Sequence, residues 1–476
     1  MAYSKKPTYS FETSASVGIN KVPSGRVVLV DDYEGRPQAF MTFGDLSTLQ
    51  DDTTIAQAIE KGFLSRFDTH ETSVARGILT PGELGFGCGV ASDTLATELK
   101  LTGMPGFRDP TSVNYGNYWD ANKNVFVFIP KFYFKWEKNT VFVSPVEKDG
   151  YVIHRAFINA GKEIEGFFIG KYQFSFPNSK AASVQGSVWN KQQGYRYLEE
   201  ANKLGDRYTI INMFMFNALA VLTKAQRQNG RNCAWMDVAP YYPKGNNNNG
   251  RDVNDQSVFY IFSKNDSNHT AYQVTGSGIP FAKTTHNGQN CGVCDINGNT
   301  WEFSLGMTSE GTKYFVPKLE TDMTKFTHNV KNGANTDEQC AWGDNAYLSN
   351  PKGFFEELNI TGTVYTSAAD IHYVFGKGDE QVIPFNATKG SDHWKLSCLG
   401  VPFMAGATQG TSGGSEEFGN DCIYYAGGYS GTKINHLMPR LGGDYGDAAV
   451  AGVFAQGLNL HRTDSTQYCS SRLAII

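Results

Sequence analysis

The last part of the chain, residues 440–476, most constrains what this sequence can fold into. Glycines and other small residues recur at 440–445 and 451–454, and an apolar, strand-like run closes the segment at 472–476. A polar loop, 456–468, lies between pieces that read as strands. A buried final strand gives such a loop a rigid floor, so its side chains can vary without unfolding the rest. This arrangement is typical of binding proteins.

Composition points to sheets and loops. The chain has 476 residues, which predicts two or three domains of roughly 150 residues each. Aromatic residues make up 13% and charged residues only 19%, and the 51 glycines favour strands and loops over helices. A net charge of -5 without a dense run of Lys or Arg argues against nucleic acid as a partner.

Neither membrane insertion nor a disulfide framework is expected. The first residues are polar where a signal peptide would be apolar, and the most apolar window, 210–222, is interrupted by Asn212 and Asn217. The cysteines are spread irregularly, so we expect mostly reduced core residues. They are Cys88, Cys233, Cys291, Cys294, Cys340, Cys398, Cys422 and Cys469.

Residues 1–110 differ from the rest because they contain few large core residues. The run 26–30 predicts a strand, the capped run 55–63 predicts a helix, and 94–99 predicts a further short helix. A segment with so small a core is commonly stabilised by copies of itself or by a neighbouring protein. We therefore expect an attachment and oligomerisation module at 1–110 and a second domain at 111–476.

The second domain is predicted to be α+β and rich in loops, with short antiparallel strands and few helices. Residues 125–136 alternate as a strand pair with buried aromatic side chains, and 165–172 read as another strand. Apolar residues from Ile211 to Leu222 fall on one helix face and predict an amphipathic helix. Long Gly- and Asn-rich loops follow from residue 244, and loops of that length usually carry function.

A motif at 292–303 resembles the Gly-Asn-x-Trp-Glu-Trp signature of the C-type-lectin-like fold of formylglycine-generating enzymes and bacteriophage variable proteins. A turn at 297–298 would reverse the chain, Trp301 would anchor the core, and Glu302 would bond to backbone donors across the turn. Other pieces of that fold follow in the required order, so the resemblance covers residues 112–476. The residues carrying the structural motif are Asn299, Trp301, Glu302, Arg440, Gly442, Gly443 and Arg472.

The spacing of the final segment is similar to the variable region of phage receptor-binding proteins of the major tropism determinant type, which retroelements diversify. The resemblance implies a tail fibre or tail-tip protein, made in the host cytoplasm and carried on the virion. It would be a homotrimer, held to other phage structural proteins by the N-terminal module, and would bind a host receptor, either a protein or a glycan. Tyr445 and the ending Cys469-Ser-Ser-Arg472 depart from the usual pattern, which leaves retroelement diversification open.

Within the candidate variable region, 440–476, we predict a set of polar and aromatic side chains that contact the receptor. Rigid aromatic rings and adaptable amides give contact area at modest entropic cost, and linking three weak sites raises avidity. The predicted receptor-binding residues are Tyr445, Asp447, Gln456, Asn459, His461, Arg462, Asp464, Gln467 and Tyr468.

The alternatives are an oxidoreductase of the formylglycine-generating type and a structural head or baseplate protein without receptor contact. The oxidase needs two cysteines after the paired glycines to bind copper and attack substrate. None lies between Gly443 and Tyr468, so we expect no enzyme and no catalytic residue.

Weaker motifs have plainer explanations. The run 410–414 matches a nucleophile elbow around Ser412 but lacks its flanking strand and helix. Cys291 and Cys294 supply only half of a zinc site, and 295–299 lacks the ligands of an EF-hand loop. No cofactor is therefore expected. The resemblance leaves a calcium site open elsewhere, with Asp252 and Asp255 as its candidates.

Overall fold

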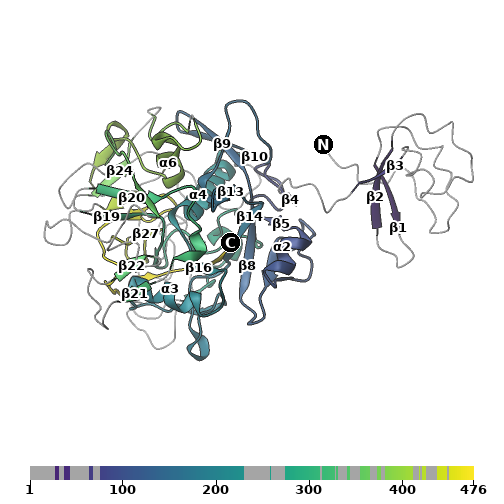
Figure 1. Cartoon of the computed structure of the whole chain (residues 1–476), viewed down its shortest axis with the longest axis horizontal. Coiled ribbons are helices and arrows are strands. Elements are labelled where there is room, and N and C mark those ends of the chain that lie inside the picture. The colour runs from purple at the N-terminus through teal and green to yellow at the C-terminus, as the bar shows by residue number, and fades with distance from the viewer. Residues whose placement is uncertain are drawn as a thin grey trace, which may run out of the picture. The chain divides into compact units, whose positions relative to one another are not determined.

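Figure 1 shows the computed structural model of the chain, which divides into two compact units, Met1–Ser73 and Val74–Ile476. For the strands at 27–31, 37–42, 64–67, 328–330 and 340–342, and for residues 76 and 310, only the backbone is described. The structure also describes residues 77–229, 258, 274–309, 313–326, 354–364, 372–376, 381–386, 388–410, 418, 421–424, 437–447 and 450–476.

The first unit contains an antiparallel sheet of three strands, β1 (Val27–Asp31), β2 (Pro37–Thr42) and β3 (Leu64–Phe67). The strand predicted at 26–30 is confirmed as β1. The helix predicted at 55–63 lies outside the described residues. The attachment and oligomerisation role of this part of the chain stays a prediction.

The second unit begins at Val74, so residues 76–110 lie in it rather than in a separate module ending at 110. This stretch forms β4 (Arg76–Gly77), β5 (Gly89–Val90), α2 (Asp93–Glu98) and β6 (Thr102–Gly103). Several of its apolar side chains, among them Phe86, are buried in the main hydrophobic core. A small apolar content suffices because the neighbouring sheet supplies the rest of the core.

One sheet of the second unit joins the two ends of that unit. Its six strands are antiparallel to their neighbours, so the late strand β30 is hydrogen-bonded between two much earlier strands. The spatial order is β16 (Tyr208–Ile210), β30 (Leu473–Ile475), β14 (Gly166–Gly170), β8 (Val125–Pro130), β7 (Asn117–Trp119) and β6.

The strand pair predicted at 125–136 is corrected by the structure. Two strands form, β8 and β9 (Tyr133–Glu137), but they belong to different sheets. β8 pairs with β7 and β14, whereas β9 pairs with β10 (Thr140–Ser144) and β11 (Val152–Ile153). Alternation shows where strands lie but not which strands pair.

A second sheet carries most of the final segment. Seven strands form it, and all neighbours are antiparallel except the parallel pairs β26–β28 and β18–β29. The order is β25 (Ala407–Gln409), β24 (His372–Phe375), β26 (Cys422–Tyr424), β28 (Gln456–Gly457), β27 (Arg440–Leu441), β18 (Trp301–Phe303) and β29 (Cys469–Ser470).

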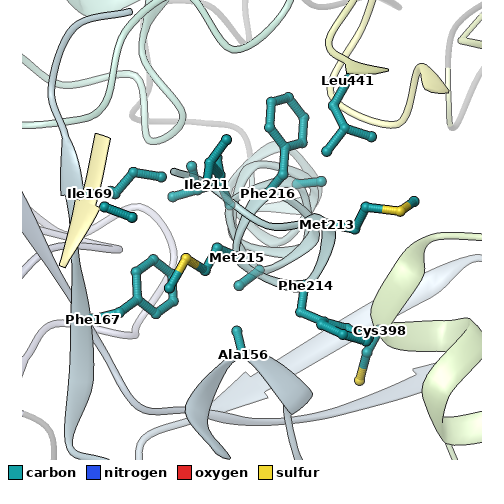
Figure 2. Packing of buried hydrophobic residues seen from close by; sticks show 14 of the residues in the cluster. Ala156, Phe167, Ile169, Ile211, Met213, Phe214, Met215, Phe216, Cys398 and Leu441 are labelled. Carbon is teal, nitrogen blue, oxygen red and sulfur yellow. The ribbon is translucent and has the colours of Figure 1, made fainter. Parts of the chain in front are cut away.

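The helix predicted from Ile211 to Leu222 is confirmed as α4 (Met213–Gln228), but it is not a surface helix with one apolar face. It is buried on all sides from Met213 to Gln226, as expected of a helix inside a core. Figure 2 shows its side chains pointing in different directions, with Phe216 towards Leu441 of β27 and Met215 towards Phe167 of β14. α4 therefore lies between elements of both sheets.

The remaining elements connect these layers. The other helices are α3 (Gly194–Asn202), α6 (Asp392–Leu399) and the short 3₁₀ turns η3 (Arg155–Phe157), η4 (Pro177–Ser179), η6 (Phe281–Thr284), η7 (Met323–Lys325) and η11 (Met404–Gly406). The other strands are β12 (Ile158–Asn159), β13 (Lys162–Glu163), β15 (Gly186–Ser187), β17 (Val274–Thr275), β19 (Thr308–Glu310), β20 (Lys313–Pro317), β21 (His328–Val330), β22 (Cys340–Trp342) and β23 (Phe355–Glu357).

The structure is thus α+β and rich in strands, with mostly antiparallel sheets and four α-helices in the described residues. This confirms the predicted class. In the part of the chain that the structure describes, no helix is both long and apolar enough to span a bilayer.

Candidate functional site

A tight turn after β27 starts the candidate site. Gly442 and Gly443 have φ of 93° and 81°, in the region that favours glycine. A Cβ on Gly443 would lie 2.6 Å from the Cα of Ala451, so the two chain segments approach as closely as their backbones allow. The two glycines therefore fix where the following loop leaves the sheet.

A buried ion pair stabilises the strands that lie beneath this loop. Arg472 donates to both carboxylate oxygens of Glu302, from Nε at 3.0 Å and from Nη2 at 2.5 Å. Its guanidinium also donates to the carbonyls of Gly170, Lys171 and Cys294. Burial opposes the charge of Arg472, but Glu302 outweighs it and the pKa of Arg472 is raised. The pair joins β18 to the chain entering β30.

The predicted partner of Glu302 is corrected by this geometry. We expected Glu302 to accept from backbone donors across the turn, but it accepts from the side chains of Arg472 and Gln173. The same Gln173 accepts from Asn299 at 2.6 Å, and the turn itself places Gly298 and Asn299 at positive φ. Trp301 is 1% exposed. The motif therefore holds the sheet through side chains distant in sequence.

Two carboxyl groups meet in the turn between β27 and β28. The amide of Asp444 donates to Oδ2 of Asp447 at 2.9 Å, and the amide of Gly446 donates to Oδ1 of Asp444 at 2.6 Å. The hydroxyl of Tyr424 donates to Oδ1 of Asp447 at 3.1 Å. The carboxyl groups of Asp444 and Asp447 thus accept the hydrogen bonds that close this turn. The hydrogen bond from Tyr424 joins the turn to β26.

The surroundings of Asp444 and Asp447 oppose the ionisation of both carboxyl groups at once. Burial, and then the nearby charge of Asp447, raise the pKa of Asp444 to about 7. Burial also raises the pKa of Asp447, against the hydrogen bond from the Asp444 amide and the charge of Arg440. Groups that interact this strongly titrate as a pair. The pair therefore gives up its protons at a higher pH than two exposed carboxyl groups would.

Arg440 lies beside this acid pair, held by two aromatic rings. Its guanidinium carbon is 4.7 Å from the ring centre of Trp301 and 5.8 Å from that of Tyr424. Nη2 donates to Oδ1 of Asn459 at 3.1 Å. Arg440 thereby joins β27 to the loop after β28.

The loop at 458–468 is held mainly through its backbone. The amide of His461 donates to Oδ2 of Asp464 at 2.8 Å, which closes a small turn. Gln193, next to α3, donates to the carbonyl of Thr463 at 2.9 Å, and Asn190 donates to that of Gln467 at 2.9 Å. Anchoring through the carbonyls of Thr463 and Gln467 leaves the side chains of Gln467 and Tyr468 available for contact.

The structure divides the nine predicted contact residues into two groups. Tyr468 is 40% exposed, and five others are partly exposed on the same two loops. Those five are Asp447, Asn459, His461, Asp464 and Gln467. The ring centres of Tyr445 and Tyr468 are 5.6 Å apart, so the two loops touch.

The other three predicted contact residues are corrected, because their side chains are buried. Tyr445 is 1% exposed, Gln456 3% and Arg462 0%. Gln456 donates to the carbonyl of Leu399 at 2.6 Å and so supports the end of α6. Their polarity suggested the surface, but the close approach of the two loops places them beneath it. Residues that sequence reasoning missed are Tyr424, Asn190 and Gln193, for which the sequence offers no signal.

The metal motifs form internal contacts instead. Oδ2 of Asp295 accepts from the amide of Gly276 at 2.7 Å and from the hydroxyl of Thr275 at 3.1 Å. Among the described residues, no group of three or more His, Cys, Asp or Glu side chains could hold a metal ion. Ser412, Asp252 and Asp255 lie outside those residues.

A cavity of about 280 Å³ lies between α2, the start of β14 and the end of β30. Glu98, Glu165 and Arg207 line it together with apolar residues such as Phe168. None of the nine predicted contact residues lines this cavity. It is therefore a separate feature from the loop surface.

No protein-family model matches the chain, and no curated protein matches it. Its function is therefore inferred from its own residues.

Proposed function

We propose that this chain is a bacteriophage receptor-binding protein, in which a C-type-lectin-like domain presents the 443–468 loops to a ligand on the host cell. The protein would sit on the virion as a tail fibre or tail-tip component, as a homotrimer. The N-terminal part would attach it to other virion proteins.

One observation carries the proposal. Six polar or aromatic side chains are at least partly exposed on two adjoining loops, and each loop begins and ends in a strand of the seven-stranded sheet. The buried ion pair of Glu302 and Arg472 fixes the position of the strands beneath these loops. A rigid floor with exposed, sequence-tolerant loops is what recognition surfaces require.

The chemistry of this surface suits recognition of a protein or glycan. Tyr468 presents an exposed ring with a hydroxyl, which gives contact area with few rotatable bonds. Asn459 and Gln467 add amides that both donate and accept hydrogen bonds. Because such contacts are individually weak, three copies in a trimer would supply the avidity.

Removal of the exposed side chains tests the proposal. Replacing His461, Gln467 and Tyr468 together by alanine should lower adsorption of the labelled protein to intact bacterial cells at least about tenfold. The melting temperature should stay nearly unchanged because these side chains lie at the surface. Tyr445 is left in place because it is buried.

A matched control separates recognition from general surface change. Phe142 on β10 is 38% exposed, and Phe142→Ala should leave adsorption unchanged. Light scattering gives the mass in solution, for which a trimer is expected. Full adsorption by the folded triple variant, or a monomer that binds no strain in a broad panel, would contradict the proposal.

A further inference from the structure

Two buried cysteines far apart in sequence lie side by side in the second unit. The thiol of Cys88 donates to the carbonyl of Cys291 at 3.6 Å, across 203 positions of chain. Cys88 is 0% exposed and Cys291 2%. Each thiol affects the pKa of the other, as expected of close neighbours. Both cysteines are free in this structure.

One amide contacts both sulfurs. Nδ2 of Asn287 lies 3.4 Å from Sγ of Cys88 and 3.6 Å from Sγ of Cys291. The same nitrogen donates to the carbonyl of Phe86 at 2.6 Å. Gly292 makes room for this amide, since a Cβ there would lie 2.1 Å from Oδ1 of Asn287. The pair is therefore positioned by surrounding groups.

A buried cation lies next to the pair. Lys171 is 5% exposed, and its Nζ donates to Oδ1 of Asn117 and to the carbonyl of Asn290, each at 2.7 Å. Asn117 in turn donates to the carbonyl of Cys291 at 2.8 Å. The hydrogen bond from Cys88, together with Asn287 and Lys171, lowers the pKa of Cys291 against the effect of burial. A thiolate is the nucleophile in disulfide exchange.

Sequence spacing would pair Cys291 with Cys294 instead. The thiol of Cys294, however, donates to the carbonyl of Lys171 at 3.0 Å and to Oδ2 of Asp295 at 3.3 Å. Cys294 therefore has its own partners, and Cys291 faces Cys88.

We propose that Cys88 and Cys291 are a redox site that forms an intramolecular disulfide by exchange with a small-molecule disulfide such as oxidised glutathione. The Cys291 thiolate attacks one sulfur of the oxidant and releases one glutathione thiolate. The Cys88 sulfur then attacks the mixed disulfide at Cys291 and releases the second. Two protein S–H bonds are lost, one S–S bond forms, and the two protons pass to the two released thiolates.

The bond would cross-link the segment preceding β5 to the loop that carries Asn287. A cross-link that closes so long a loop stabilises mainly by restricting the unfolded chain. Thiols stay reduced in a bacterial cytoplasm and oxidise outside it. The disulfide would therefore raise the free energy of unfolding of the protein after the protein leaves the cell. This inference holds whatever ligand the protein binds.

Mapping of the cysteines tests the proposal on the full-length chain. The protein is reduced, freed of reductant, and incubated with oxidised or with reduced glutathione. Remaining thiols are then alkylated, and unreduced peptides are analysed by mass spectrometry. Only the oxidised sample should yield peptides of Cys88 and Cys291 joined, lighter by two hydrogen atoms than the free pair. The melting temperature should rise on the order of 5 °C and fall back with dithiothreitol.

Serine variants separate the redox site from a packing effect. Oxidation should neither cross-link nor stabilise Cys88→Ser or Cys291→Ser, whereas Cys294→Ser, also buried and only three positions away, should keep both responses. Each variant is compared with its own reduced form, so any cost of the substitution cancels. The peptide mapping of the unmodified chain decides the matter even if a variant fails to fold.

Incubation is done at room temperature and again just below the unfolding temperature, where local opening admits the oxidant. The proposal is overturned if both thiols remain free under both conditions. It is also overturned if Cys291 ends linked to Cys294, to a second chain, or to glutathione alone.

Discussion

At the scale of single residues, burial changes what a side chain does. Asp444 is 6% exposed and lies against Asp447, and these surroundings raise its pKa to about 7. Tyr445, its neighbour in sequence, is buried under Tyr468 rather than offered to a ligand. Residue type alone does not distinguish these outcomes.

The acid pair makes stability depend on pH. The pKa of Asp444 rises from 3.8 in the unfolded chain to about 7 in the folded protein. The stabilisation by protonation is therefore fully present below about pH 4 and is lost as pH rises through about 7. Relative to Asp444→Asn, the unmodified protein should lose on the order of 2–4 kcal/mol of unfolding free energy from pH 4 to pH 8.

Urea unfolding of both proteins across this pH range measures the difference. Other groups titrate in the same window: burial lowers the pKa of His154 to about 3 and that of His286 to about 4. Their effect has the opposite sign, because stability is lost as pH falls, and it cancels in the comparison. A difference that does not change with pH would show that Asp444 is not protonated in the folded state.

At the scale of elements, close approach decides where loops and helices lie. α4 is buried all round, and its polar residues find partners inside: Asn217 contacts His154 at 3.0 Å, and the ammonium of Lys224 lies 4.4 Å from the ring centre of Phe418. The turn after β27 depends on glycine at 443 because the Cα and Cβ of Ala451 fill the space beside it.

Gly443→Ala should destabilise the protein by about 2–4 kcal/mol, because a left-handed backbone costs roughly 1–2 kcal/mol and the new methyl group meets Ala451. Gly150→Ala is the matched control. Gly150 has φ of +75°, but nothing lies within 4 Å of an added Cβ, so only the backbone cost of roughly 1–2 kcal/mol applies. Equal losses in chemical denaturation would show that the contact with Ala451 is unimportant.

At the scale of the whole molecule, the final segment of the chain forms part of the sheets themselves. β30 lies between β16 and β14, and Arg472 ties it to Glu302 and to three backbone carbonyls. Two sheets and the central helix therefore share one core.

Glu302→Gln should cost about 3–5 kcal/mol of unfolding free energy, because it leaves the charge of Arg472 buried without its counter-ion. Glu163→Gln makes the same chemical change in partly exposed ion pairs with Lys131 and Lys389, and should cost at most about 1 kcal/mol. Denaturant unfolding of both variants checks this. A similar small loss in both would mean that the buried pair does not hold the sheet together.

By itself, the sequence determined the α+β class, a strand at 26–30, a helix over 211–222 and the burial of Trp301, because local periodicity and side-chain size report these directly. Only the tertiary structure decided that β8 and β9 belong to different sheets and that Glu302 meets Arg472. It also placed Cys88 beside Cys291 and divided the predicted contact residues into buried and exposed. These contacts join residues that are up to hundreds of positions apart in the sequence. Tertiary packing selects them, and no local sequence pattern encodes that packing.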